Sequence, residues 1–273
     1  MTCLKSDTWC KATCNWSELC VEMGCGRVRL PGGLLHTYDV GVTGTFYNYV
    51  LVQDPNSFSL RMTEAEFSRR GLPFAIRIPR ENSFSEFERS LCDARYALVP
   101  VWKLMTHEKD AGERNRAVTV ERVGSDRLAD WIAIISTGFN LSEKHRVTQY
   151  EMVRRASRSE SVQLLLAILN EKPVGTGLLY FKDRIASIHM ISTLPEFRKK
   201  HVATTIILEA RDRCKDEKAN MIWLRTRKGG IGEKVYSKIG FKPFSDILTY
   251  TRTPNLDSTA FASNRSQQSG HSI

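Results

Sequence analysis

The chain has 273 residues, 41% of them hydrophobic, which is enough to bury a sizeable core in one large or two small domains. Forty basic and thirty acidic side chains give a formal net charge of +10, which favours acidic partners such as phosphorylated cofactors, nucleic acid or anionic membranes. No apolar run approaches the roughly 20 residues of a membrane span, and the first residues lack the apolar core of a signal peptide, so we expect a soluble, cytoplasmic protein.

The N-terminus is rich in cysteine. Its cysteines have irregular spacing without a Cys-x-x-Cys pair, and only His36 follows closely, so zinc binding is weakly supported. The total of seven is odd, which argues against a full disulfide framework. We therefore predict reduced thiols on a helical segment within residues 1–30, and no metal site. The five cysteines of this segment are Cys3, Cys10, Cys14, Cys20 and Cys25.

The first half of the chain alternates helices and strands. We expect a helix near residues 16–23, a strand within 44–54 and a helix at 61–71 that opens with a capping box from Thr63 to Glu66. A strand at 72–79, a helix at 83–95 and a strand at 96–106 follow. This alternation indicates a layered α/β unit. The polar, charged stretch at 105–117, with Gly112 inside it, is the expected linker.

The second half begins with a strand at 117–123 and a helix at 125–137, capped by Ser125 or Asp126. After a helix at 142–156, three strands (162–170, 174–182 and 185–193) form an antiparallel meander, with turns at 171–173 and 183–184. A basic loop, a helix, a strand at 221–227, a short helix at 232–239 and a strand at 241–252 complete the half. The Ser-rich residues 253–273 are expected to be disordered.

The basic loop joins a buried strand to a helix. The stretch LPEFRKKHVATTII ends the strand at Pro195, carries positive charge from Arg198 to Lys200, and returns to helical spacing from Ala203. Because the first turn of a helix presents unpaired N–H groups and a positive dipole, this arrangement favours phosphate binding. A solvated charge run that precedes a surface helix is the simpler alternative.

This order of elements, with two motifs, resembles the GCN5-related N-acetyltransferase (GNAT) family over residues 117–252. In the basic loop, which is similar to the family's acetyl-CoA loop, Arg198 and Ala203 match and His201 stands where a glycine is expected. The second motif, VYSKIGF at 235–241, is similar to the family's Tyr-x-x-x-Gly-Phe. The first half resembles a degenerate GNAT-like repeat without the anion loop.

The resemblance implies an α/β (α+β) fold with a mixed, mostly antiparallel sheet flanked by helices. It divides the chain into the N-terminal segment 1–30, a degenerate half domain at 31–112, a GNAT domain at 113–252 and a tail at 253–273. The implied activity is acetyl-CoA-dependent N-acetyl transfer to a primary amine by direct attack in a ternary complex. The implied contacts to acetyl-CoA come from Ile191, Thr193, Arg198, Lys199, Lys200, His201, Val202, Ala203 and Thr204.

The resemblance also implies catalytic and acceptor residues. Tyr236 corresponds to the tyrosine that faces the departing sulfur as general acid. Strand periodicity places Ser187, His189, Ile191 and Thr193 on one face, where His189 is either a base or a buried core histidine.

Acceptor recognition is expected at Phe139, Asn140 and Leu141, with Tyr150 as a weaker candidate. A small-molecule amine and a protein amine both fit this composition, and neither the acceptor nor the oligomeric state is determined by the sequence. A non-catalytic, regulatory acyl-CoA-binding protein of the same fold remains the alternative, because of His201. Nucleic-acid binding is disfavoured, because the basic residues are spread and mixed with acids.

Overall fold

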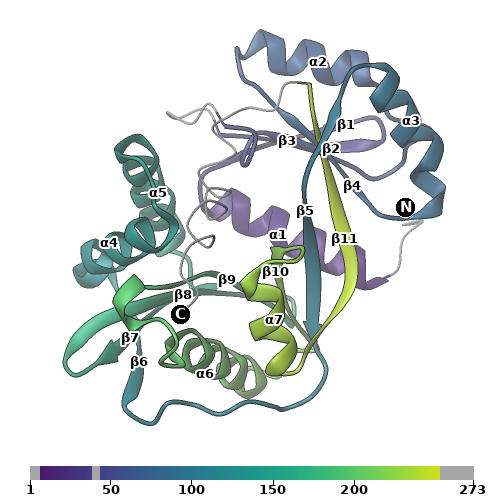
Figure 1. Cartoon of the computed structure of the whole chain (residues 1–273). Coiled ribbons are helices and arrows are strands. Elements are labelled where there is room, and N and C mark those ends of the chain that lie inside the picture. The colour runs from purple at the N-terminus through teal and green to yellow at the C-terminus, as the bar shows by residue number, and fades with distance from the viewer. Residues whose placement is uncertain (1–6, 39–43, 253–273) are drawn as a thin grey trace, which may run out of the picture.

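One mixed sheet runs through the residues that the computed structural model describes, which are 7–38 and 44–252. Its eleven strands lie in the order β1-β2-β3-β4-β11-β5-β10-β9-β8-β7-β6 (Figure 1). Two neighbouring pairs, β3–β4 and β9–β10, are parallel, and the other pairs are antiparallel. The expected α/β class with a mostly antiparallel sheet is therefore confirmed.

The first half of the chain contributes three helices and five strands. In chain order they are α1 (Asp7–Glu22), β1 (Gly26–Leu30), β2 (Gly33–Thr37), β3 (Tyr49–Val52), α2 (Leu60–Arg69), β4 (Ala75–Pro79), α3 (Ser85–Asp93) and β5 (Ala97–His107).

The second half contributes four helices and six strands. In chain order they are β6 (Val118–Val123), α4 (Leu128–Phe139), α5 (Glu143–Ala156), β7 (Val162–Leu169), β8 (Lys172–Lys182), β9 (Ile185–Thr193), α6 (Val202–Asp216), β10 (Met221–Arg227), α7 (Ile231–Lys238) and β11 (Phe241–Thr251).

The two halves repeat one arrangement. In the first half, α2 follows β3 and α3 follows β4; in the second, α6 follows β9 and α7 follows β10. Each half ends in an eleven-residue strand that enters the other half, because β11 lies between β4 and β5 while β5 lies between β11 and β10. The long strands run side by side between the halves (Figure 1). This arrangement agrees with the expected degenerate repeat.

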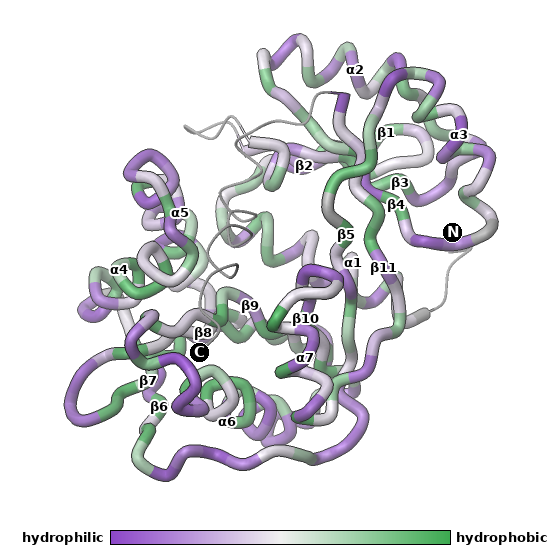
Figure 2. The backbone as a smooth tube through the Cα atoms, in the orientation of Figure 1, coloured by the Kyte–Doolittle hydropathy of each residue, from purple (hydrophilic) through white to green (hydrophobic). Residues whose placement is uncertain are grey.

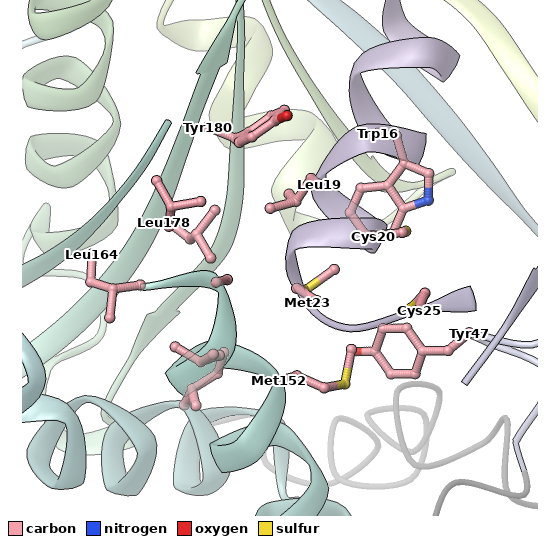
Figure 3. Close-up of a cluster of buried hydrophobic side chains, with 14 of the residues drawn as sticks. Trp16, Leu19, Cys20, Met23, Cys25, Tyr47, Met152, Leu164, Leu178 and Tyr180 are labelled. Atoms are coloured by element: carbon pink, nitrogen blue, oxygen red, sulfur yellow. The ribbon is translucent and has the colours of Figure 1, made fainter. Parts of the chain in front are cut away.

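Apolar side chains cover both faces of the second half's sheet. On one face, α1, α4 and α5 pack over the strands, and residues such as Trp16, Met152 and Leu178 belong to one cluster (Figure 3). On the other face, α6 contributes Ile206 and Ile207 to a second cluster. The N-terminal helix therefore belongs to the core, and α1 lies between the two halves in Figure 1.

Local signals at several element ends differ from the expected ones. Ser59 caps α2 by accepting from the Met62 N–H, so the capping box at Thr63 is wrong. A 3-10 turn at Ser125–Arg127 precedes α4, which places Arg127 at the N-cap without a side-chain capping bond. The hairpin between β7 and β8 turns at residues 170–171 and not at 171–173, because β8 already begins at Lys172. Both turn residues have positive φ, which suits a two-residue hairpin.

The connection between the halves starts later than expected, because β5 continues to His107. It is mainly hydrophilic where it crosses from β5 to β6 in Figure 2. Arg114 anchors it to α6 by ion pairs with Glu209, at 2.7 Å, and Asp212.

Among the described cysteines, Cys10 is disulfide-bonded, so the expectation of reduced thiols is wrong there, whereas Cys14, Cys20, Cys25, Cys92 and Cys214 are free. Residues 253–273, expected to be disordered, lie outside the described residues.

Candidate functional site

Strands β9 and β10 separate along part of their length. Their parallel pairing runs from Ile185–Met221 to Ile188–Leu224 and stops there. Strand β9 continues to Thr193, whereas β10 continues to Arg227 in pairing with β5. The backbone of residues 189–193 therefore lies beside no paired strand on its β10 side. Sequence alone does not reveal this opening, because it depends on where the pairing of the two strands ends.

A bulge at the opening redirects the side chains of β9. Thr176 pairs with Ser192 and Leu178 with His189, so Met190 and Ile191 together face Gly177, and Met190 has a φ of +53°. Ser187 and His189 share one face with Ser192, while Ile191 packs in the cluster under α6. The expectation that Ile191 and Thr193 share the face of His189 is wrong, because the bulge inverts the alternation.

Two residues of the basic loop have a left-handed backbone conformation. Lys199 and His201 have φ of +64° and +57°, and His201 is the N-cap of α6. Histidine is among the side chains enriched in this left-handed region. The first N–H groups of the helix have no intrahelical acceptor, and the His201 side chain makes no capping bond to them. Asn115 holds the loop by donating from Nδ2 to the Lys200 carbonyl at 3.0 Å.

The loop side chains project toward solvent and toward α4. Arg198, Lys199, Lys200 and His201 are exposed, and Val202 is buried at the start of α6. Arg198 donates to the carbonyl of Gly138 at 3.3 Å. The structure thus brings the basic loop together with the end of α4.

The expected acceptor residues lie at that same end. Phe139 is the last residue of α4, Asn140 caps it in the left-handed conformation, and the N–H of Leu141 donates to Ser136. The helix passes very close to β9 here, since a Cβ on Gly138 would lie 1.8 Å from the Ser192 hydroxyl. Tyr150 is 41% exposed on α5.

Tyr236 lies on α7, half-buried against the cluster under α6 that also includes Ile191. Its ring centroid is 6.4 Å from that of Phe241. Burial raises the pKa of Tyr236 to about 12, so the phenol holds its proton at neutral pH.

His189 faces the opposite cluster. It is 6% exposed, and its ring centroid lies 5.0 Å from that of Trp16 and 5.6 Å from that of Trp223. Burial, reinforced by the positive charge of Arg225, holds the pKa of His189 well below its ordinary value. The imidazole is therefore neutral, and its Nε2 has no hydrogen-bond partner among the described residues.

Sequence reasoning missed the contribution of α1 to this region. Asn15 accepts from Ser187 Oγ at 2.6 Å and from Trp223 Nε1 at 3.2 Å, and its Nδ2 donates to the Ile185 carbonyl. It thereby ties α1 to both β9 and β10. Spacing gave no signal for this role, because a single Asn on a helix is ordinary.

Two further observations concern metal-binding groups and membrane-spanning helices. Within residues 7–38 and 44–252, no group of three or more His, Cys, Asp or Glu is arranged to hold a metal ion. Among the described helices, none has the length and apolar character needed to cross a bilayer.

Comparison with known proteins supports the family resemblance. Residues 126–241 match the model of the Acetyltransferase (GNAT) family. No curated protein matches the chain.

Solved structures give the same result for the fold. A GCN5-related N-acetyltransferase from Kribbella flavida has a TM-score of 0.67 at 16% identity, covering 88% of this chain and 94% of that one. One from Sphaerobacter thermophilus has a TM-score of 0.61 at 13% identity, covering 82% of each chain. A tandem GNAT protein from the clavulanic acid biosynthesis pathway has a TM-score of 0.56 at 10% identity, covering 83% and 80%. Residues 126–241 therefore match the GNAT acetyltransferase family model, and the chain as a whole shares its fold with solved GNAT proteins.

Proposed function

We propose that the protein is an acetyl-CoA-dependent N-acetyltransferase that transfers the acetyl group to a primary amine by direct attack in a ternary complex. The observation that carries this proposal is the opening between β9 and β10 beside a basic loop already in a left-handed conformation. His201 adopts the conformation for which glycine is favoured, so its presence is compatible with the loop shape.

The residues at the opening fit acetyl-CoA. The N–H groups of Val202, Ala203 and Thr204 begin α6 and would hold the pyrophosphate, with positive charge from the neighbouring Arg198, Lys199 and Lys200. The Thr193 hydroxyl is buried without a partner among the described residues, as expected where a polar ligand belongs. Backbone groups at Ile191 and Thr193 would bind the pantetheine and polarise the thioester.

Bound acetyl-CoA would supply the activated acetyl group. The amine nitrogen would bond to the carbonyl carbon as the carbon–sulfur bond breaks, and Tyr236 would donate its proton to the departing sulfur. A phenol with a raised pKa keeps that proton until the thiolate appears. For the amine proton we favour release to water, because His189 is enclosed by Trp16 and Trp223 and packs as a core histidine.

The acceptor would approach beside Phe139, Asn140 and Leu141, which the loop side chain of Arg198 joins to the acetyl-CoA site. The half-buried phenyl ring of Phe139 provides apolar contact. Both a small amine and a protein amine fit this description.

Calorimetric titration of acetyl-CoA tests the proposal. The wild type should bind, Arg198→Glu should weaken binding strongly, and the exposed control Arg122→Glu on β6 should leave it unchanged. A panel of primary amines should then give acetylated product.

Binding without product from any small amine or peptide would support the regulatory acyl-CoA-binding alternative. Absence of binding would refute both readings.

A further inference from the structure

Two arginines meet in the core beneath α1. Arg77, on β4, is 4% exposed, and Arg225, on β10, retains part of its surface. Their guanidinium carbons lie 5.7 Å and 5.0 Å from the centroid of the same ring, that of Phe46. The two positive charges thus come from different halves of the chain to one place.

The described residues around these arginines supply no carboxylate. Arg77 donates from Nη2 to the Phe46 carbonyl at 2.7 Å and lies 3.9 Å from the Tyr49 ring, while its Nε has no partner. Arg225 lies 3.6 Å from the ring of Trp16. Aromatic rings offset part of the cost of burying a cation, but buried charges normally require an opposite charge.

Both guanidinium groups line a small cavity between α1 and the sheet. The cavity has a volume of about 20 Å³, and Trp16, Tyr49 and Trp223 also line it. This volume holds a particle slightly larger than a water molecule.

One internal group could balance part of the charge. Cys20 Sγ lies 3.7 Å from the Tyr49 hydroxyl. Burial acts to raise the pKa of Cys20, but hydrogen bonds with Cys25 and Tyr49 and the charges of both arginines lower it. Even a Cys20 thiolate would neutralise only one of the two guanidinium groups.

We propose that Arg77 and Arg225 form an internal binding site for one small inorganic anion of halide size, held in the cavity beneath α1. The anion balances the buried charge and joins α1 to the two halves of the sheet, since its neighbours come from α1, β4 and β10. This site is separate from the basic loop, and the proposal does not depend on acetyl transfer.

Thermal unfolding in different sodium salts at equal ionic strength tests the site. Chloride or bromide should raise the Tm relative to gluconate, which is too large for the cavity. For a Kd of about 1 mM, 100 mM halide lowers the unfolding equilibrium constant about 100-fold, a shift of roughly 5–10 °C. Arg77→Met and Arg225→Met should each abolish the difference between the salts, whereas Arg122→Met should keep it.

Bromide soaked into wild-type crystals provides a readout that needs no variant. An anomalous peak between the two guanidinium groups supports the site. A cavity that holds only water, an equal Tm in all three salts, or a halide effect that persists in either methionine variant would overturn it.

Discussion

Replacement of His201 by glycine tests whether the backbone or the side chain shapes the basic loop. His201 caps α6 with a φ of +57°, its side chain makes no capping bond, and it is exposed. Because glycine adopts this conformation without steric cost, we expect His201→Gly to stabilise the protein and to preserve acetyl-CoA binding.

The size of the effect follows from two opposing terms. A side chain in the left-handed region costs about 1–2 kcal/mol. Glycine loses more conformational freedom on folding than histidine does, and this entropy cost reduces the stabilisation by about 0.5–1 kcal/mol. The expected net change is about 0.5–1 kcal/mol in the free energy of unfolding, or roughly 1–4 °C in Tm for a chain of this size.

Thermal unfolding measured beside calorimetric titration of acetyl-CoA is the assay. Lys199 has a φ of +64°, so Lys199→Gly should also raise the Tm. Arg198 has an extended conformation, with φ of −64° and ψ of 158°, and its side chain donates to Gly138, so Arg198→Gly should lower the Tm.

A lower Tm for His201→Gly, or a marked loss of acetyl-CoA affinity, would refute the reasoning. Either result would show that the imidazole itself holds the loop or contacts the ligand. The backbone explanation would then apply to Lys199 alone.

Three other substitutions test separate parts of the structure. Tyr236→Phe removes the proposed acid, so kcat should fall about 10²–10⁴-fold while calorimetry shows unchanged acetyl-CoA affinity; an unchanged kcat would contradict the assignment. Gly138→Ala places a Cβ 1.8 Å from Ser192 Oγ, so denaturant unfolding should show a loss of about 1–3 kcal/mol, and an unaltered midpoint would argue against this close packing. Burial lowers the pKa of His36 to about 3 from an ordinary 6.5, so the unfolded state takes up the proton first and stability falls with acid. Between pH 6.5 and 5 this loss reaches about 2 kcal/mol, and His36→Leu should flatten the profile in urea titrations.

The spacing of apolar residues and the positions of turn residues predicted most of the helices and strands, because these elements depend on local chemistry. The strands at β7, β8 and β9 and their meander followed from apolar runs separated by short polar turns. Helix ends were less predictable, since Ser59 and Thr63 both carry hydroxyls and only the position of the first turn decides which one caps α2.

The sequence indicated which elements form the candidate site, but it did not predict the strand geometry there. Arg198 lies in the loop before α6 and Tyr236 lies on α7, which are the elements that the sequence pattern predicted for them. The bulge at Met190 was invisible, because it depends on the pairing of Thr176 and Leu178 across the strand. The buried arginines did leave a signal: Arg77 and Arg225 each interrupt an apolar strand.

The first half of the chain supports the opening even though it lacks an anion loop of its own. Strand β10 leaves β9 after Leu224, and its last residues would then have no partner within the second half. They pair instead with β5, from Trp223–Thr106 to Arg227–Trp102. Because β5 holds the far edge of β10, the strand can diverge from β9 without losing its backbone hydrogen bonds. The first half therefore contributes to the candidate site through strand pairing, and Asn15 on α1 hydrogen-bonds to both β9 and β10.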